Sequence, residues 1–169
     1  DFKLILSSEW EFSPRTYPAV FKDLPELIFI GSPAFEADNS LIFPLAGHEL
    51  GHSVWRHKPM ESGSQALAQE LEKRVVASFE ANWDEFSRRA GITTDKSQLT
   101  QDLFLRRIWT ESYKLALRQI EELFCDIFGL RLFGEGYFYS FAYLLCPNLG
   151  IRPRNYPPIQ MRVRALFRG

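Results

Sequence analysis

The stretch LIFPLAGHELGHSVWRHK (residues 41–58) places two histidines, His48 and His52, four positions apart, with Glu49 directly after the first. On an α-helix, residues four apart lie about 6 Å along the axis and about 40° around it, so both imidazoles can reach one ion. Apolar residues flank the motif, and Pro44 is tolerated in a first helical turn. The stretch therefore predicts a helix over 41–58 that carries a pair of zinc ligands.

Glu49 falls beside the helix face that carries the two histidines. From there its carboxylate can accept a proton from a metal-activated water and pass it to a leaving amine. The alternative is a surface helix with an accidental histidine pair, although polar residues on an otherwise apolar segment need a reason. The pattern thus links two metal ligands to a general base.

Composition bounds the class of protein. With 169 residues, of which 46% are hydrophobic and 15% aromatic, the chain is sufficient for one domain with a core. A net charge of −1 with mixed charges argues against nucleic-acid binding. Cys125 and Cys146 fit buried free thiols in a reducing compartment, and the sequence shows neither a signal peptide nor a membrane-spanning run. We expect a cytoplasmic protein, while the start at Asp1 leaves open further domains of a longer parent protein.

The remaining elements follow from hydrophobic periodicity and from the positions of Gly and Pro. An apolar run over 27–30, closed by Gly31, predicts a strand within a strand and loop region over 1–40. We therefore expect one α+β, mostly helical domain over 1–169 with a small N-terminal sheet. Its later elements are predicted as long helices over 62–90 and 98–133, a helix over 137–146, and a Pro-rich segment with a C-terminal helix over 147–169.

A zinc site with two histidines needs a third protein ligand, so that the fourth position is left to water. His57 would be rotated away from the ligand face on a continuing helix. Glu122 and Asp126 are better candidates, because carboxylates in an apolar helix are costly unless a cation or a donor receives them. One of the two can ligate zinc while the other accepts a hydrogen bond from the second nitrogen of a ligand histidine.

The same helix leaves an alternative open. Glu122 and Asp126 can instead pair with the nearby Arg118 or Arg131. Glu121 points about 100° away from Glu122 around the helix, so we expect it to be solvated or salt-bridged.

The HELGH motif, followed on a later helix by E-x-x-x-D, resembles the gluzincin metallopeptidases, which include the thermolysin-like enzymes and the minigluzincins. The resemblance implies zinc bound by His48, His52 and Glu122. It also implies Glu49 as the general base and Asp126 as the residue that orients a ligand histidine. The implied fold is a zincin-like (minigluzincin) domain whose active-site helix packs on the third-ligand helix. The implied reaction is hydrolysis of a peptide or protein substrate.

The tail YPPIQMRVRAL (residues 156–166) is similar to the pattern H-P-x-x-x-x-R-[IV]-x-x-L, which ends the soluble catalytic core of the prenyl-protein and heat-shock membrane peptidases. Tyr156 replaces the leading histidine, which the resemblance assigns to transition-state stabilisation. A tyrosine hydroxyl can also donate to a developing oxyanion, and packing beside two prolines is the alternative role. Arg162 is expected to anchor the final helix near the site.

Two other functions remain open. One is a catalytically latent or inactive zinc-stabilised domain, with an interaction or regulatory role in a larger protein, which would have no use for Glu49 as a base. The other is a binder of apolar ligands built from the 15 phenylalanines, which show no pattern beyond an ordinary core. The strand over 27–30 also has two interpretations. It is either purely structural or an edge on which peptidases of this kind pair with an extended substrate.

Overall fold

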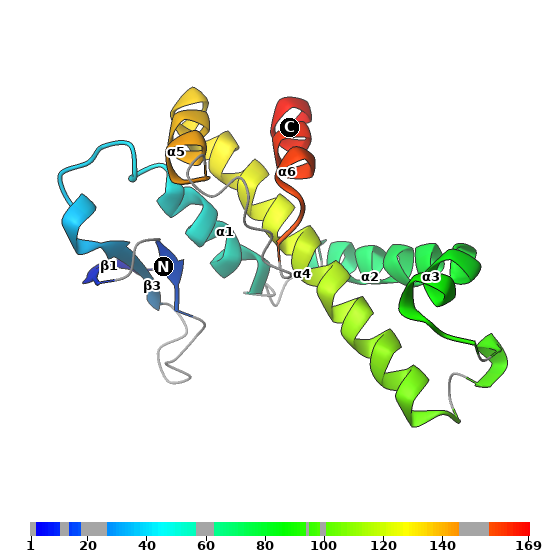
Figure 1. The fold of residues 1–169 in the computed structure, drawn as a ribbon. Coiled ribbons are helices and arrows are strands. Elements are labelled where there is room, and N and C mark those ends of the chain that lie inside the picture. The colour runs from blue at the N-terminus through cyan, green and yellow to red at the C-terminus, as the bar shows by residue number, and fades with distance from the viewer. Residues whose placement is uncertain are drawn as a thin grey trace. The chain divides into compact units, whose positions relative to one another are not determined.

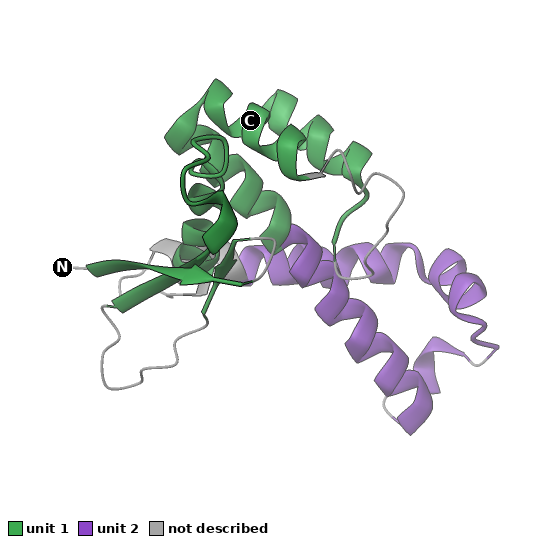
Figure 2. Ribbon diagram, turned by 60° about the vertical axis from the view of Figure 1, so that its left-hand side comes forward, with its two compact units in different colours: residues 1–57, 121–169 green, residues 58–120 purple. Residues whose placement is uncertain are grey.

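The computed structural model describes residues 3–10, 14–17, 27–56, 63–93, 95–98, 101–145 and 156–169. The chain divides into two compact units, shown in Figure 2. Unit 1 comprises Asp1–His57 and Glu121–Gly169, and unit 2 comprises Lys58–Ile120. The assignment of the whole chain to one metallopeptidase-like domain stays a prediction.

The described residues are mostly helical with one small sheet, which confirms the predicted mixture of elements (Figure 1). The strands are β1 (Lys3–Glu9), β2 (Arg15–Thr16) and β3 (Leu27–Pro33). The helices are α1 (Leu45–Arg56), α2 (Gly63–Ala81), α3 (Trp83–Ala90), α4 (Leu103–Phe133), α5 (Glu135–Leu145) and α6 (Ile159–Arg168), with short 3-10 turns η1 (Ala34–Glu36) and η2 (Lys96–Gln98).

β3 is the central strand of the sheet, whose order is β1-β3-β2. β1 pairs with β3 in parallel and β2 pairs with it antiparallel, with Thr16 opposite Ile30. Ile28 and Ile30 are buried, as expected where alternate side chains of a strand face a core. β2 and β3 both contact α1, so the sheet lies beside the helix that carries the histidine motif.

Glycines allow α1 to approach the C-terminal part of α4 closely. A Cβ added to Gly51 would lie 2.9 Å from the Cα of Cys125, and one added to Gly47 would lie 3.0 Å from the Cα of Gly129. Larger residues would force the two helices apart. The motif histidines are therefore held close to the side chains of α4.

A cluster of buried apolar residues joins α1, α5 and α6 in unit 1. It consists of Ile42, Leu45, Tyr137, Phe141 and Leu166. Between α4 and α5 the chain turns at Gly134, whose φ of 56° is in the left-handed region that glycine adopts without strain. The predicted break after Phe133 is therefore present, and it directs α5 back onto α1.

The helices predicted over 62–90 and 98–133 differ from those of the structure. The helix expected over 62–90 is divided at Asn82, whose side-chain amide donates to the Ser78 carbonyl oxygen at 2.8 Å. Such side-chain bonds compete with continued helix. The helix expected from 98 begins at Leu103, because Asp102 Oδ1 accepts hydrogen bonds from the main-chain N–H groups of Phe104 and Leu105 and so caps the first turn.

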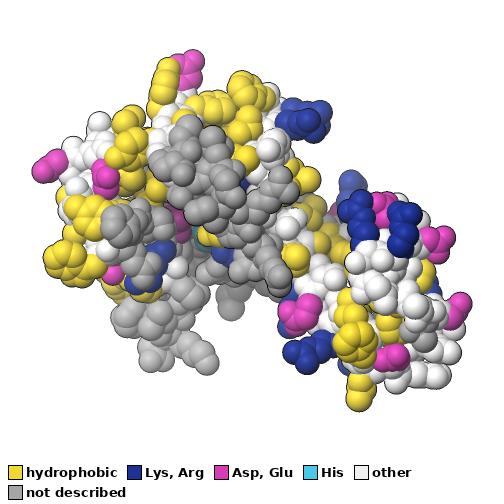
Figure 3. Space-filling view, viewed as in Figure 1, with side chains coloured by type: hydrophobic (Ala, Val, Ile, Leu, Met, Phe, Trp, Pro, Cys, Tyr) yellow, Lys and Arg dark blue, Asp and Glu magenta, His cyan; other side chains and the backbone are white. Residues whose placement is uncertain are grey.

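The active-site helix predicted over 41–58 begins at Leu45 and is described to Arg56. The residues before it form turns, in which Ile42 N–H donates to the Asn39 carbonyl oxygen. Across the described residues, no helix combines the length and apolar character needed to cross a membrane. Acidic and basic side chains are interspersed on the face of unit 2 that Figure 3 shows, in keeping with the net charge of −1.

Candidate metal centre

α1 carries His48, Glu49 and His52, and all three are buried, with 8%, 9% and 5% of their surface exposed. The two imidazole rings lie with their centroids 4.9 Å apart at an interplanar angle of 85°. This arrangement follows from their spacing, because residues four apart on a helix are neighbours on its surface. The motif is therefore an interior feature of unit 1.

α4 places Glu122 opposite the histidine pair. Its carboxylate is fully buried, with Oε2 3.2 Å from His48 Nε2 and Oε1 3.6 Å from His52 Nε2. Ligand atoms about 2 Å from a tetrahedral ion lie about 3.3 Å apart, so these separations match a shared metal ion. The structure thus brings together the three residues that the resemblance named as ligands.

The other nitrogen of each histidine is held by a different carboxylate. His48 Nδ1 lies 3.0 Å from Asp126 Oδ1, and His52 Nδ1 lies 2.8 Å from Glu121 Oε1. An ionised carboxylate only accepts hydrogen bonds, so each Nδ1 carries the hydrogen. Glu121 was expected to be solvated or salt-bridged, and the structure shows the second of these, because the side chain is buried at 8% exposure and pairs with His52.

With this tautomer, Nε2 of each histidine needs a positive charge between it and Glu122. With hydrogen on Nδ1, a neutral imidazole presents a lone pair at Nε2, and here that lone pair faces the oxygens of Glu122. Either a proton or a metal ion must lie between them to make the contact favourable. Burial by itself lowers the pKa of His48, yet hydrogen bonds to Asp126 and Glu122 raise it to about 9. The site is therefore built to hold a positive charge.

Asp126 is fixed by a buried arginine and a buried tyrosine. Arg162 donates from Nε to Oδ2 and from Nη2 to Oδ1, both at 2.7 Å, and the Tyr137 hydroxyl donates to Oδ1 at 2.8 Å. Burial opposes ionisation of Asp126, but the hydrogen bonds from Arg162 and His48 lower its pKa to about 2. The cation beside Asp126 thus comes from α6, whereas the sequence had offered Arg118 or Arg131 of its own helix.

Tyr137 was missed by sequence reasoning. It is fully buried and its ring lies against Gly129, where an added Cβ would come within 2.4 Å of the ring carbon Cε2. Burial and the charge of Asp126 raise its pKa well above the ordinary value, so the hydroxyl stays protonated and donates. The signal available in the sequence was only a tyrosine in an apolar helix, whose hydroxyl needs a partner when buried.

Cys125 lies on the Nδ1 side of His52, with Sγ 3.3 Å from that nitrogen. His48, His52 and Cys125 have ligand atoms within 4.8 Å of one another, and this buried group could hold a metal ion. Burial, followed by the charges of Glu122 and Glu121, raises the pKa of the thiol, so it remains protonated in the absence of a metal. The predicted free, buried state of Cys125 is confirmed.

Three further residues were singled out in the sequence. Tyr156 is 40% exposed, and the Arg162 guanidinium carbon lies 5.6 Å from the centre of its ring. Its role as an oxyanion donor stays a prediction. His57 and Cys146 lie outside the described residues.

Glu49 has a contact that the sequence did not indicate. The Thr16 hydroxyl lies 2.9 Å from Glu49 Oε2 and 2.5 Å from the Glu49 carbonyl oxygen. Thr16 is on β2, the strand beside α1, and is 33 positions away along the chain. The packing of the sheet on α1 brings the two residues together. No pattern within a few residues of the sequence could therefore have predicted the contact.

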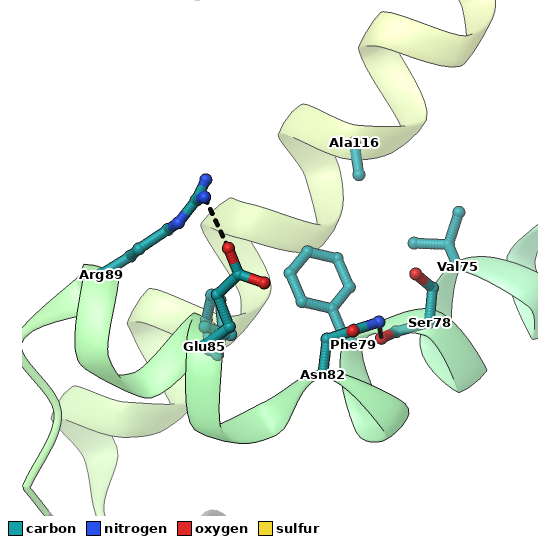
Figure 4. A pocket seen from close by; sticks show the side chains of 8 residues that line it. Val75, Ser78, Phe79, Asn82, Glu85, Arg89 and Ala116 are labelled. Carbon is teal, nitrogen blue, oxygen red and sulfur yellow. Dashed lines mark hydrogen bonds and ion pairs between the residues drawn. The ribbon is translucent and has the colours of Figure 1, made fainter.

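Unit 2 contains a separate hollow of about 400 Å³ between α2, α3 and α4, shown in Figure 4. Phe79 and Ala116 supply apolar walls, and an ion pair between Glu85 and Arg89 lies at one side. None of the predicted site residues lines it.

In comparisons with known proteins, no family model, no curated protein and no solved structure matched this chain. The resemblance to gluzincins therefore rests on the sequence motifs. The histidines of the HELGH motif lie in a buried cluster that could hold a metal ion.

Proposed function

We propose that this protein is a zinc-dependent peptidase in which His48, His52 and Glu122 bind the ion and Glu49 is the general base. One observation carries the proposal: both Nε2 atoms face the Glu122 carboxylate while both Nδ1 atoms are held by other carboxylates. That is the arrangement in which hydrogen-bonded carboxylates fix the tautomer of metal-ligating histidines.

Glu122 is a better third ligand than Cys125. The Glu122 oxygens lie on the Nε2 side of both histidines. The Cys125 sulfur instead contacts Nδ1 of His52, the nitrogen that Glu121 also contacts. Two imidazoles and one carboxylate form a set that zinc accepts while keeping one position open. The cluster contains several buried carboxylates and one buried arginine, Arg162. A divalent cation would offset the excess negative charge.

The proposed reaction is hydrolysis of a peptide bond. Zinc in this site would polarise the scissile carbonyl and lower the pKa of a water. Glu49 takes the proton from the attacking water as the C–O bond forms, and then gives it to the leaving amine as the C–N bond breaks. Asp126 and Glu121 keep His48 and His52 in the required tautomer. Tyr156 is the proposed donor to the oxyanion.

Metal analysis tests the ligand set. Protein purified without chelator should contain about one zinc per chain. Glu122→Gln and His48→Ala should lose it, because each removes a ligand. Cys125→Ser should retain it, since the thiol lies on the Nδ1 side. Retention by Glu122→Gln together with loss by Cys125→Ser would replace Glu122 with Cys125 as the third ligand.

Peptide cleavage tests the reaction. The parent chain should cleave casein or members of a peptide library, and Glu49→Gln should reduce the rate by about 100-fold or more, since it removes the general base. Glu111→Gln is the matched control, because Glu111 is an exposed residue paired with Lys114 on α4. Equal cleavage by the parent and by Glu49→Gln would refute the mechanism.

A second function, a latent or inactive zinc-stabilised domain, is favoured by the burial of the site. His48 and His52 are 8% and 5% exposed. Such a domain would bind zinc and gain stability from it without cleaving any peptide. Zinc binding at full stoichiometry with no cleavage across the library would favour this function over the peptidase.

A further inference from the structure

The position of β2 beside α1 is fixed by main-chain pairing. Thr16 lies opposite Ile30 in the antiparallel register, and the N–H of Tyr17 donates to the Phe29 carbonyl oxygen at 3.2 Å. Both strands contact α1. The backbone at Thr16 is therefore held in place independently of its own side chain.

Alternate side chains along β2 serve different faces. Arg15 donates from Nη2 to the Tyr17 hydroxyl at 2.7 Å, and its Nη2 lies 3.7 Å from Glu9 Oε2 on β1. Because successive side chains of a strand point to opposite faces, Thr16 points the other way, toward α1. The strand thus anchors itself to the sheet through its outer residues and presents one hydroxyl to Glu49.

That hydroxyl contacts Glu49 twice. It lies 2.9 Å from the side-chain oxygen Oε2 and 2.5 Å from the carbonyl oxygen of the same residue. The hydroxyl has one hydrogen, which is shared between these two acceptors, so it holds Oε2 beside the carbonyl oxygen of the same residue. A glutamate side chain without such a contact samples several rotamers, so this contact restricts the orientation of the carboxylate.

We infer that Thr16 is a positioning residue for Glu49. By holding Oε2, it fixes the plane of the carboxylate and hence the direction of Oε1, the oxygen left to exchange a proton with the attacking water. The inference rests on the proposed function, because positioning matters only where Glu49 acts as a base. A general base must lie within hydrogen-bonding reach of its proton, and a small misplacement of a catalytic group lowers the rate steeply.

Three substitutions at one site test the inference in the full chain. Thr16→Val keeps the shape and β-branching of the side chain without the hydroxyl, Thr16→Ala removes the hydroxyl with less bulk, and Thr16→Ser keeps the hydroxyl. Both hydroxyl-free variants should lower kcat by about 10- to 100-fold with KM within about twofold of the parent, while Thr16→Ser should stay within about threefold in kcat. All three should keep the parent's zinc content, because the Thr16 hydroxyl contacts Glu49, which is not a proposed zinc ligand.

The matched control is Thr110→Val, since the Thr110 hydroxyl donates to the Arg106 carbonyl oxygen on α4 in unit 2. It should leave kcat, KM and zinc content unchanged. Unfolding curves show whether each variant is folded, and Thr16→Ala and Thr16→Ser provide the comparison if valine disrupts β2.

The outcomes separate this inference from the proposed function. A parent chain that cleaves no peptide overturns the proposed function and this inference with it. If the parent is active and Thr16→Val or Thr16→Ala retains or exceeds its kcat, the inference alone is overturned. Equal loss of kcat in Thr16→Ser and Thr16→Val also overturns it, because the hydroxyl would then not be the group that matters.

Discussion

At the scale of single residues, the site is a series of hydrogen-bonded side chains in which each residue determines the protonation of the next. Arg162 keeps Asp126 ionised, Asp126 holds the hydrogen of His48 on Nδ1, and Nε2 thereby faces Glu122, where it binds a proton or a metal ion. A carboxylate with such partners is costly to bury alone and favourable as part of the complete set. Removing any one member should therefore affect both folding and metal binding.

Tyr137→Phe tests the member that the sequence did not reveal. The change removes the hydroxyl that donates to Asp126 at 2.8 Å and leaves the ring in place. We expect a loss of about 1–2 kcal/mol in the free energy of unfolding and a reduction of about 10-fold in zinc affinity. Urea denaturation and zinc titration measure the two quantities.

The control for this substitution is Tyr139→Phe, because Tyr139 is 64% exposed on the same helix. It should change neither quantity. A zinc affinity of Tyr137→Phe equal to that of the parent would mean that Arg162 alone suffices to orient Asp126.

The pKa of His48 predicts how stability depends on pH. In the metal-free protein this pKa is raised from 6.5 to about 9, despite burial, by hydrogen bonds to Asp126 and Glu122. The protonated form therefore stabilises the fold fully below pH 6.5, and this contribution is lost as the pH rises through about 9. We expect the metal-free chain to lose roughly 1–3 kcal/mol over that interval.

Excess zinc should reverse this dependence, because a metal ion replaces the proton and binds the neutral imidazole. Chemical denaturation across the interval, with chelator and with zinc, gives both curves. His48→Gln should lack the fall seen in the metal-free parent. An identical fall in His48→Gln would assign the titration to another group.

At the scale of elements, the site depends on how closely α4 approaches α1 and α5. Gly51 and Gly47 have no side chain where α1 contacts α4, and the absence of a side chain at Gly129 leaves space for the ring of Tyr137. Helical glycine is costly by itself, by about 1 kcal/mol relative to alanine. The presence of Gly129 in α4 is explained by the Tyr137 ring, which occupies the space of the missing side chain.

Gly129→Ala should therefore destabilise unit 1. An added Cβ would lie 2.4 Å from Tyr137 Cε2, so the ring must shift and its hydroxyl must leave Asp126. We expect a loss of about 1–3 kcal/mol in the free energy of unfolding, together with weaker zinc binding. Thermal unfolding and zinc titration would show both effects.

Gly136→Ala on α5 is the matched control. Its Cβ would lie 3.7 Å from Pro44, an ordinary contact, so alanine should raise stability by about 0.4–1 kcal/mol. If Gly129→Ala also raised stability, the close contact between Gly129 and Tyr137 would not be a determinant of the site.

At the scale of the whole molecule, all residues of the candidate metal centre belong to unit 1, although Glu121 and Glu122 directly follow the last residue of unit 2. Unit 2 has its own aromatic cluster, in which Trp109 contacts Phe79, Trp83 and Phe86. Local unfolding in one unit can therefore be tested separately from metal binding in the other.

Trp109→Ala should destabilise unit 2 by about 1–3 kcal/mol, since it removes a half-buried ring that three other aromatic side chains contact. Amide hydrogen exchange should increase over α2 and α3, while the zinc content stays at about one per chain. Phe104→Ala, at a position 70% exposed on α4, should change neither measurement. Loss of zinc from Trp109→Ala would show that the metal centre requires an ordered unit 2.

Local sequence information accounts for the helix of the HELGH motif, for the carboxylates of α4 and for the break at Gly134. Each is a pattern within a few residues, and helical periodicity converts such a pattern directly into positions on one face. The same information misplaced the boundaries at Asn82 and Asp102, where side-chain hydrogen bonds to the main chain end or begin a helix.

By itself, the sequence determined which residue types are available for a metal centre, that His48 and His52 share a helix face, and that Glu49 lies beside it. Only the tertiary structure decided which partner each nitrogen and oxygen receives. Glu121 meets His52, Tyr137 and Arg162 meet Asp126, and Thr16 meets Glu49 across separations of 69, 11, 36 and 33 positions. The physical reason is that hydrogen bonds act over about 3 Å, and such contacts depend on how helices and strands pack, which local periodicity does not encode.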